Sequence, residues 1–154
     1  MPSSANGVVG LKPTYGRVSR YGVLTMAPSL DHVGPMARNV ADAAFMFDAI
    51  AGFDPQDPTS LNEPPSNVLG QIDQGVKNLR IGLDRGYALH GIDGGQAAAL
   101  ESAVKVLEGL GAQIVEVKMP KVADVVETWL PICSSEMATA HAASYPSRAS
   151  EYGP

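Results

Sequence analysis

A strand–helix–strand pattern at about residues 79–118 constrains the fold of this chain more than any other part of its sequence. Apolar side chains alternate with other residues over 79–83, which is the period of a β-strand. Asp93 can cap a helix over about 93–110, and a second apolar run follows at 114–117. Two strands that are joined by one helix through short connections pair in parallel, with a right-handed crossover. The chain is therefore predicted to be of the α/β class, with a βαβ unit in this region.

The composition agrees with a folded domain and excludes several classes of protein. The chain has 154 residues, of which 45% are hydrophobic and 18% are charged, as is ordinary for a globular protein with a core. The formal net charge is −5, and the lysines and arginines are scattered along the chain. The sequence therefore offers no basic track for nucleic acid and no basic surface for an anionic membrane.

The cysteine count and the N-terminus indicate the compartment. Cys133 is the only cysteine, which excludes an intramolecular disulfide and a multi-cysteine metal site and favours a reducing compartment. No charged segment followed by an apolar run marks a signal peptide, and no apolar stretch approaches the ~20 residues that span a bilayer. We expect a soluble cytoplasmic protein.

Three sections are predicted along the chain. The first section, residues 1–52, contains an apolar run at 7–11, which is predicted to be a buried strand. Residues 53–78 are rich in proline and form an extended connection, and residues 79–154 hold the βαβ unit and a terminal helix. Both ends of the chain have loop-like sequence. We therefore expect the whole chain to form a single incomplete domain, as a fragment of a longer protein.

Two helices are predicted outside the βαβ unit. Asn39 can cap a helix whose apolar residues recur at helical spacing and form one buried face. A last helix is predicted over about 122–143, in which Pro131 introduces a break or a kink. Trp129 and Ile132 are expected to pack inward from this helix.

Serine, lysine, cysteine and histidine side chains raise the question of nucleophilic catalysis. A pair formed by Ser3 or Ser4 with Lys12 would need a neutral lysine held beside the hydroxyl, and the spacing alone does not supply that. Cys133 and His141 are eight residues apart on a predicted helix, which separates them by ~12 Å along its axis. That distance is too large for a thiolate–imidazole pair, so Cys133 is interpreted as a core residue.

Three histidines and one aspartate are the remaining candidate ligands. His32, His90 and His141 lie far apart in the sequence and lack the short spacing of metal ligands, so no metal site is predicted. Asp31 lies in an apolar stretch, where a carboxylate needs a partner. We expect Asp31 to cap a turn or to pair with an arginine.

Four blocks of sequence, in order, resemble the region that follows the Gly/Ser-rich signature of amidase-signature enzymes. The blocks are GVVGLKPTYGRVS at 7–19, APSLDHVGPMAR at 27–38, DAA at 42–44 and DPQDPTS at 54–60. The resemblance is specific over residues 1–60 and looser over residues 61–154.

This resemblance implies a fold, an activity and a mechanism. The family fold is a mixed β-sheet flanked by helices, of which this chain would hold a part. Members hydrolyse carboxylic amides, or release ammonia from glutamine as the A subunit of a tRNA-dependent amidotransferase. They use a Ser–cis-Ser–Lys triad and backbone N–H groups that stabilise the oxyanion, and they need no cofactor.

The same resemblance implies where the site residues lie. The family nucleophile precedes by a few residues the proline that Pro2 resembles, so it would fall just before Met1, with the rest of the triad further upstream. No residue of this chain is therefore expected to be catalytic, and the chain alone is expected to be inactive. Tyr15, Ser29 and Asp31 match marked positions of the family near the site, and are expected to bind substrate or to support the residues that do.

Three functions remain open from the sequence. The first is an amidase, whose intact form would take a small-molecule amide as its substrate. The second is the glutamine-hydrolysing A subunit of an amidotransferase, which needs partner subunits and a path for ammonia. The third is a non-catalytic remnant that binds a partner or self-associates through its exposed edges and incomplete core.

Overall fold

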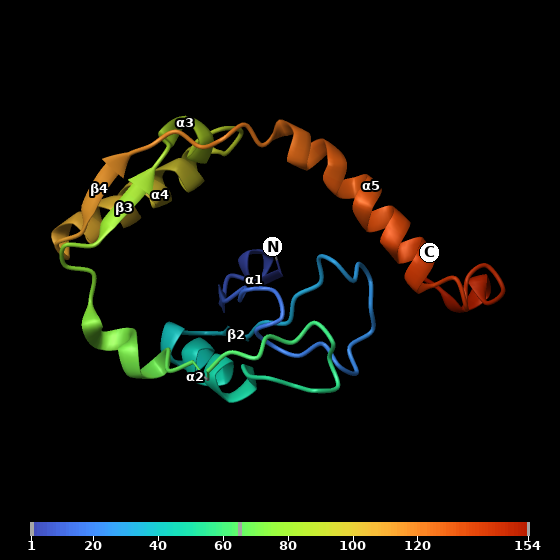
Figure 1. The fold of residues 1–154 in the computed structure, drawn as a ribbon. Coiled ribbons are helices and arrows are strands. Elements are labelled where there is room, and N and C mark those ends of the chain that lie inside the picture. The colour runs from blue at the N-terminus through green and yellow to red at the C-terminus, as the bar shows by residue number, and fades with distance from the viewer. Residues whose placement is uncertain (1, 65, 154) are drawn as a thin grey trace. The chain divides into compact units, whose positions relative to one another are not determined.

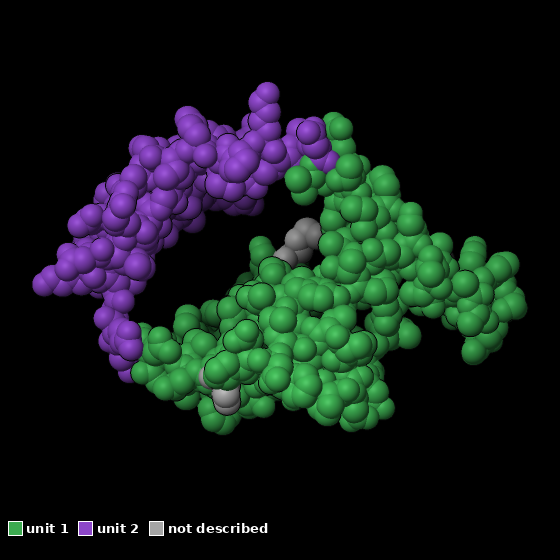
Figure 2. Space-filling model, viewed as in Figure 1, with its two compact units in different colours: residues 1–72, 125–154 green, residues 73–124 purple. Residues whose placement is uncertain are grey.

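The computed structural model describes residues 2–64 and 66–153, which divide into two compact units (Figure 2). Unit 1 comprises residues 1–72 and 125–154, and unit 2 comprises residues 73–124. In chain order the elements are α1 (Pro2–Ala5), β1 (Val9–Gly10), β2 (Met36–Ala37), α2 (Val40–Ile50), the 3-10 helix η1 (Leu69–Gln74), β3 (Arg80–Leu83), α3 (Arg85–Ala88), α4 (Gly94–Gly109), β4 (Gln113–Glu116), α5 (Ala123–Ala140) and the 3-10 helix η2 (Ala149–Glu151) (Figure 1).

Unit 2 contains the βαβ unit that the sequence predicts. Strands β3 and β4 pair in parallel, in a register that begins with Arg80 opposite Gln113. Helix α4 connects them and starts at its cap Asp93, whose Oδ1 accepts a hydrogen bond from the backbone N–H of Gln96 at 2.9 Å. Val104 is the residue of α4 that is buried. The strand pattern, the helix cap and the parallel pairing are therefore confirmed.

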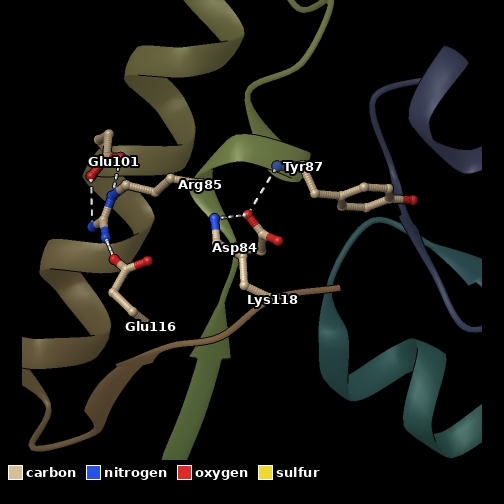
Figure 3. Close-up of polar contacts among 6 residues, drawn as sticks. All are labelled: Asp84, Arg85, Tyr87, Glu101, Glu116 and Lys118. Atoms are coloured by element: carbon tan, nitrogen blue, oxygen red, sulfur yellow. Dashed lines mark hydrogen bonds and ion pairs between the residues drawn. The ribbon is translucent and has the colours of Figure 1, made fainter. Parts of the chain in front are cut away.

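An ion-pair cluster joins the elements of unit 2 (Figure 3). Arg85, the first residue of α3, donates from Nε to Oε1 of Glu101 on α4 at 2.9 Å, and from Nη1 to Glu116 on β4. One guanidinium thus connects three consecutive parts of the unit. Arginine suits this role because its fixed fork of donors can serve two carboxylates at once.

Asp84 occupies the carboxyl end of β3, beside Arg85 (Figure 3). Its carboxylate accepts hydrogen bonds from the backbone N–H groups of Tyr87, at 3.2 Å, and Met119, at 2.9 Å. The Met119 N–H is the main reason that the pKa of Asp84 lies below its ordinary value. Ligands of parallel α/β sheets commonly bind at this edge. Here the carboxylate caps α3 and fastens the segment after β4, which is a structural role.

Unit 1 holds a two-stranded antiparallel sheet and α2. The strand predicted at 7–11 appears as the two-residue strand β1, which pairs with β2 so that Val9 lies opposite Ala37. The prediction that this strand is buried is wrong, because Val9 is half-buried and Gly10 is exposed. Asn39 caps α2 as predicted, because its side chain accepts a hydrogen bond from the N–H of Asp42 at 2.8 Å. Phe47 is buried on the face of α2 that turns to the core. The chain thus belongs to the α/β class, with small parallel and antiparallel sheets.

The predicted apolar face of α2 is only partly covered. Ala43, Ala44 and Phe47 are buried, whereas Val40 and Ile50, at the two ends of the helix, are 58% and 42% exposed. The spacing of apolar residues predicts which side of a helix faces a core, but the extent of that core depends on which other segments pack there.

The proline-rich connection contains a 3-10 helix, η1, that the sequence did not indicate. The carboxylate of Asp48, on α2, accepts hydrogen bonds from the N–H groups of Val68 and Leu69, each at 2.9 Å. These N–H groups lie at the start of η1, whose first donors have no partner within the helix. A side chain 20 residues earlier in the chain therefore stabilises this helix.

Helix α5 runs from Ala123 to Ala140 with Pro131 inside it, so Pro131 does not break the helix, and the alternative of a kink stays a prediction. Trp129 and Ile132 are 52% and 42% exposed, so the prediction that they pack inward is wrong. Cys133 is the buried residue of α5, as expected for a core cysteine. The spacing of apolar residues predicts a buried face on this helix, but it does not show how much of that face other segments cover.

Among the described residues, no helix combines the length and the apolar character that crossing a membrane requires.

Candidate functional site

Arg20 lies at the centre of a polar network in unit 1. Its Nη2 donates hydrogen bonds to the hydroxyl of Tyr15 at 2.6 Å and to Oγ1 of Thr59 at 2.8 Å. Its Nη1 donates to the carbonyl of Pro28, which also accepts a hydrogen bond from the Tyr15 hydroxyl at 2.8 Å. The guanidinium carbon stands 4.5 Å from the centroid of the Tyr15 ring. A single arginine therefore holds three loops by hydrogen bonds and cation–π stacking.

Asp57 is the buried carboxylate of this network, with 6% of its surface exposed. Its Oδ2 accepts a hydrogen bond from the N–H of Arg20 at 2.8 Å, and its Oδ1 accepts from the N–H and the hydroxyl of Thr59 at 2.9 and 2.7 Å. The Arg20 N–H contributes most to holding the pKa of Asp57 below its ordinary value. Because donors surround both oxygens, the carboxylate remains ionised despite its burial.

Asp31 caps a turn, as one of the two expectations for it states. Its Oδ2 accepts hydrogen bonds from the backbone N–H groups of Met26, at 2.9 Å, and Ala27, at 3.0 Å. Its own N–H donates to the carbonyl of Ala27 at 2.8 Å. Asp31 therefore shapes the segment 26–31 from within.

Ser29 gives both of its donors to one carboxylate. Its N–H donates to Oε2 of Glu136 at 2.8 Å, and its hydroxyl donates to Oε1 of the same residue. The Ser29 hydroxyl, and then the Ser29 N–H, lower the pKa of Glu136, while the nearby charge of Asp31 opposes them. A carboxylate with a lowered pKa is a weak base, so the pair does not have the character of an activated nucleophile.

The three residues that the sequence singled out meet at segment 26–31, which contains Ser29 and Asp31 and which Tyr15 contacts. Tyr15 contacts segment 26–31 at Pro28, Ser29 fastens it to α5, and Asp31 caps its turn. Arg20, Asp57 and Glu136 complete this arrangement, but the sequence did not point to them as site residues. Asp57 did stand in one of the four blocks of resemblance, which was the signal available for it.

A cavity of about 400 Å³ adjoins this network. Its lining includes Arg20, Asp31, Asp57 and Thr59. Nε of Arg20 is buried without a hydrogen-bond partner, the one such side-chain atom found in the described part of the chain. The cavity thus has a cationic donor and two carboxylates in its walls, although both carboxylates already accept backbone N–H groups.

The other residues weighed from the sequence do not form a catalytic group. Ser3 and Lys12 line one cavity of about 650 Å³, but the amine of Lys12 donates to the carbonyl of Pro13 at 2.9 Å. Nδ1 of His32 contacts the carbonyl of Leu30 at 2.6 Å, and Nδ1 of His141 contacts the Tyr152 hydroxyl at 2.9 Å. No cluster of three or more metal-ligating side chains occurs within residues 2–64 and 66–153.

The Asp57→Asn variant is expected to weaken the acid dependence of stability. In the folded chain the pKa of Asp57 is held below its ordinary value of 3.8, so the unfolded chain binds more protons as the pH falls. The contribution of the carboxylate is complete above its unfolded pKa and is lost as the pH falls through its folded pKa. Urea unfolding between about pH 7 and pH 2 should show that proton uptake on unfolding falls by up to about one proton in the variant.

Asp73→Asn is the matched control for this measurement. Asp73 is exposed on η1 and makes none of the contacts of Asp57. If Asp57→Asn and Asp73→Asn change the pH dependence of stability equally, the effect does not come from the buried network.

Comparisons with known proteins place these features in context. The model of the Amidase family matches residues 1–152. The A subunit of the Glutamyl-tRNA(Gln) amidotransferase of Trichlorobacter lovleyi is 49% identical over 135 residues, which cover 88% of this chain and 28% of that protein.

Two solved structures show the same likeness. The A subunit of the Glutamyl-tRNA(Gln) amidotransferase of Thermotoga maritima matches with a TM-score of 0.76 and 36% identity, over 86% of this chain and 29% of that one. The native peptide amidase of Stenotrophomonas maltophilia matches with a TM-score of 0.71 and 35% identity, over 92% of this chain and 30% of that one. The chain therefore spans less than a third of the length of these relatives.

Proposed function

Because the chain belongs to the Amidase family, we propose that it is part of an enzyme that hydrolyses a carboxylic amide through a serine nucleophile. The single observation that carries this proposal is the match of the family model to residues 1–152. The polar network around segment 26–31 supports it, because preorganised site segments are held by hydrogen bonds from several elements.

The proposed chemistry has two halves. A serine hydroxyl attacks the amide carbonyl, loses its proton to a base and forms a tetrahedral oxyanion. The base passes this proton to the amide nitrogen, and collapse of the oxyanion then breaks the C–N bond and releases ammonia or an amine. Water cleaves the resulting ester to give the carboxylic acid and free serine. Within residues 2–64 and 66–153, no serine hydroxyl shares a hydrogen bond with a lysine or histidine side chain. That the triad lies outside this chain stays a prediction, which the experiment below tests.

The second candidate is the glutamine-hydrolysing A subunit of a tRNA-dependent amidotransferase. The favouring observation is the identity of 49%, over 88% of this chain, to the A subunit from Trichlorobacter lovleyi. In that case the amide would be glutamine, the product ammonia would pass to another protein of the complex, and the chain would act only within that complex.

Ammonia release by a chimera tests the proposal. Residues 1–154 would replace the matching segment of the A subunit from Trichlorobacter lovleyi, and both the chimera and the isolated chain would be given simple amides and glutamine. The isolated chain is expected to show only the background rate, and the chimera a saturable rate. Enzymes typically exceed the uncatalysed reaction by at least ~10⁶-fold, so the two results are easily separated.

The outcomes discriminate among the candidates. Turnover by the chimera only with the partner subunits present would favour the amidotransferase reading. A saturable rate from the isolated chain would show that the triad is wrongly placed outside it. A folded chimera that never turns over, together with self-association of the isolated chain in sedimentation, would favour the non-catalytic binding remnant.

A further inference from the structure

The contact between Ser29 and Glu136 joins two parts of unit 1 that are 107 residues apart in the sequence. Both donors of Ser29 face the two oxygens of a single carboxylate, so the contact fixes the direction of the serine backbone as well as its side chain. Charge-assisted hydrogen bonds of this kind are roughly twice as strong as neutral ones.

Few other buried contacts attach α5 to unit 1. Cys133 is the only residue of this helix that is buried, and Glu136 follows it by three residues, on the same face. The apolar side chains of Val125, Val126 and Leu130 are 64%, 68% and 63% exposed. Both hydrogen bonds that segment 26–31 makes with α5 are accepted by Glu136.

Segment 26–31 is held from three directions. Tyr15 and Arg20 hold the carbonyl of Pro28, the carboxylate of Asp31 holds the turn from within, and Glu136 holds Ser29. The first two sets of contacts come from nearby in the chain. The contact of Glu136 comes from 107 residues further along the chain, so only the tertiary structure provides it.

We propose that Glu136 is a positioning residue of the amidase site, which sets the conformation of segment 26–31 by binding both donors of Ser29. This inference rests on the proposed function. The residue acts through Ser29 and does not touch the reacting atoms. Serine, at this position, is a ligand of the carboxylate and not a second nucleophile, because its hydroxyl proton is directed to a weak base.

Activity of the chimera tests the positioning role. Glu136→Ala removes both acceptors and is expected to lower kcat/KM by about 10–100-fold, since a small misplacement of a site segment can cost ~10²-fold. Glu136→Gln retains one oxygen acceptor and an amide that can donate to the serine hydroxyl, so it is expected to recover activity to within about tenfold of the parent. Ser29→Ala combined with Glu136→Ala should add little further loss, because both changes remove the same contact.

Glu127→Ala is the matched control, since Glu127 is an exposed glutamate on the same helix. It should leave kcat/KM unchanged within about twofold, as surface substitutions usually do. Circular dichroism at the assay temperature would show whether the Glu136 variants remain folded. Full additivity of the two single changes, or equal losses for Glu136→Ala and Glu127→Ala, would overturn the proposal.

Hydrogen exchange in the 154-residue chain provides a readout that does not depend on catalysis. The Ser29 amide should exchange faster in Glu136→Ala than in the parent, and at the parent rate in Glu127→Ala. An inactive chimera counts against the proposed function, and the exchange rate of the Ser29 amide then shows whether the Ser29–Glu136 contact exists. Unchanged exchange in Glu136→Ala would overturn the positioning role. Faster exchange together with unchanged kcat/KM in an active chimera would overturn it as well.

Discussion

Replacement of Phe47 by alanine is expected to lower the free energy of unfolding by about 3–4 kcal/mol. Phe47 is 6% exposed, and it is the one phenylalanine among the buried core residues of the described chain. The neighbouring core positions on the same helix, Ala43 and Ala44, are small, so their side chains cannot fill the space that a phenyl ring leaves. Urea unfolding followed by circular dichroism would measure the loss.

Phe45 offers a control on the same helix. It is 64% exposed and only two residues from Phe47, so Phe45→Ala makes the same chemical change at the same helix propensity cost. It should alter the free energy of unfolding by no more than about 0.5 kcal/mol. Equal losses in the two variants would mean that the core of unit 1 does not form around Phe47.

Replacement of Gly16 by alanine is expected to cost about 3 kcal/mol, through a left-handed backbone conformation and a steric clash together. Gly16 has φ of +78°, and a Cβ atom there would lie 2.2 Å from the carbonyl oxygen of Thr59. The carbonyl of Gly16 also accepts a hydrogen bond from Leu61 at 2.8 Å. The added methyl group would therefore push away the segment whose Thr59 side chain contacts Arg20. Unfolding in urea would measure the effect.

Gly22 separates the two causes. Its φ of +77° is nearly the same, but a Cβ atom there would meet nothing within 4 Å. Gly22→Ala should therefore cost only the conformational part, about 1 kcal/mol. If Gly16→Ala costs no more than Gly22→Ala, the close approach of the two segments at Gly16 is not present in solution.

Local signals in the sequence were sufficient for much of the secondary structure. Some signals act within a few residues: the alternation in β3, the apolar spacing of α4, and the capping side chains of Asn39 and Asp93. The strand and the helix starts can therefore be predicted without knowledge of the rest of the fold. The parallel pairing of β3 with β4 follows from the short connections, because chain geometry leaves few other topologies.

The site was only partly accessible from the sequence. Tyr15, Ser29 and Asp31 were marked by resemblance, and for Asp31 the local turn also suggested a cap. The sequence did not mark Arg20 or Glu136 as site residues. The contact of Arg20 with Thr59 spans 39 residues and that of Glu136 with Ser29 spans 107, and such long-range contacts produce no periodic pattern in the sequence. Whether segment 26–31 serves catalysis stays a proposal that the chimera tests.

The sequence by itself determined the α/β class, the βαβ unit, the helix caps and the family, since these depend on short-range periodicity, on capping chemistry and on ordered blocks of residues. Only the tertiary structure decided which apolar residues are covered and which polar groups meet. It leaves Trp129 and Ile132 exposed and joins Ser29 to Glu136. The physical reason is that burial and long-range hydrogen bonds depend on which distant segments pack together, and the period of one helix does not specify its neighbours.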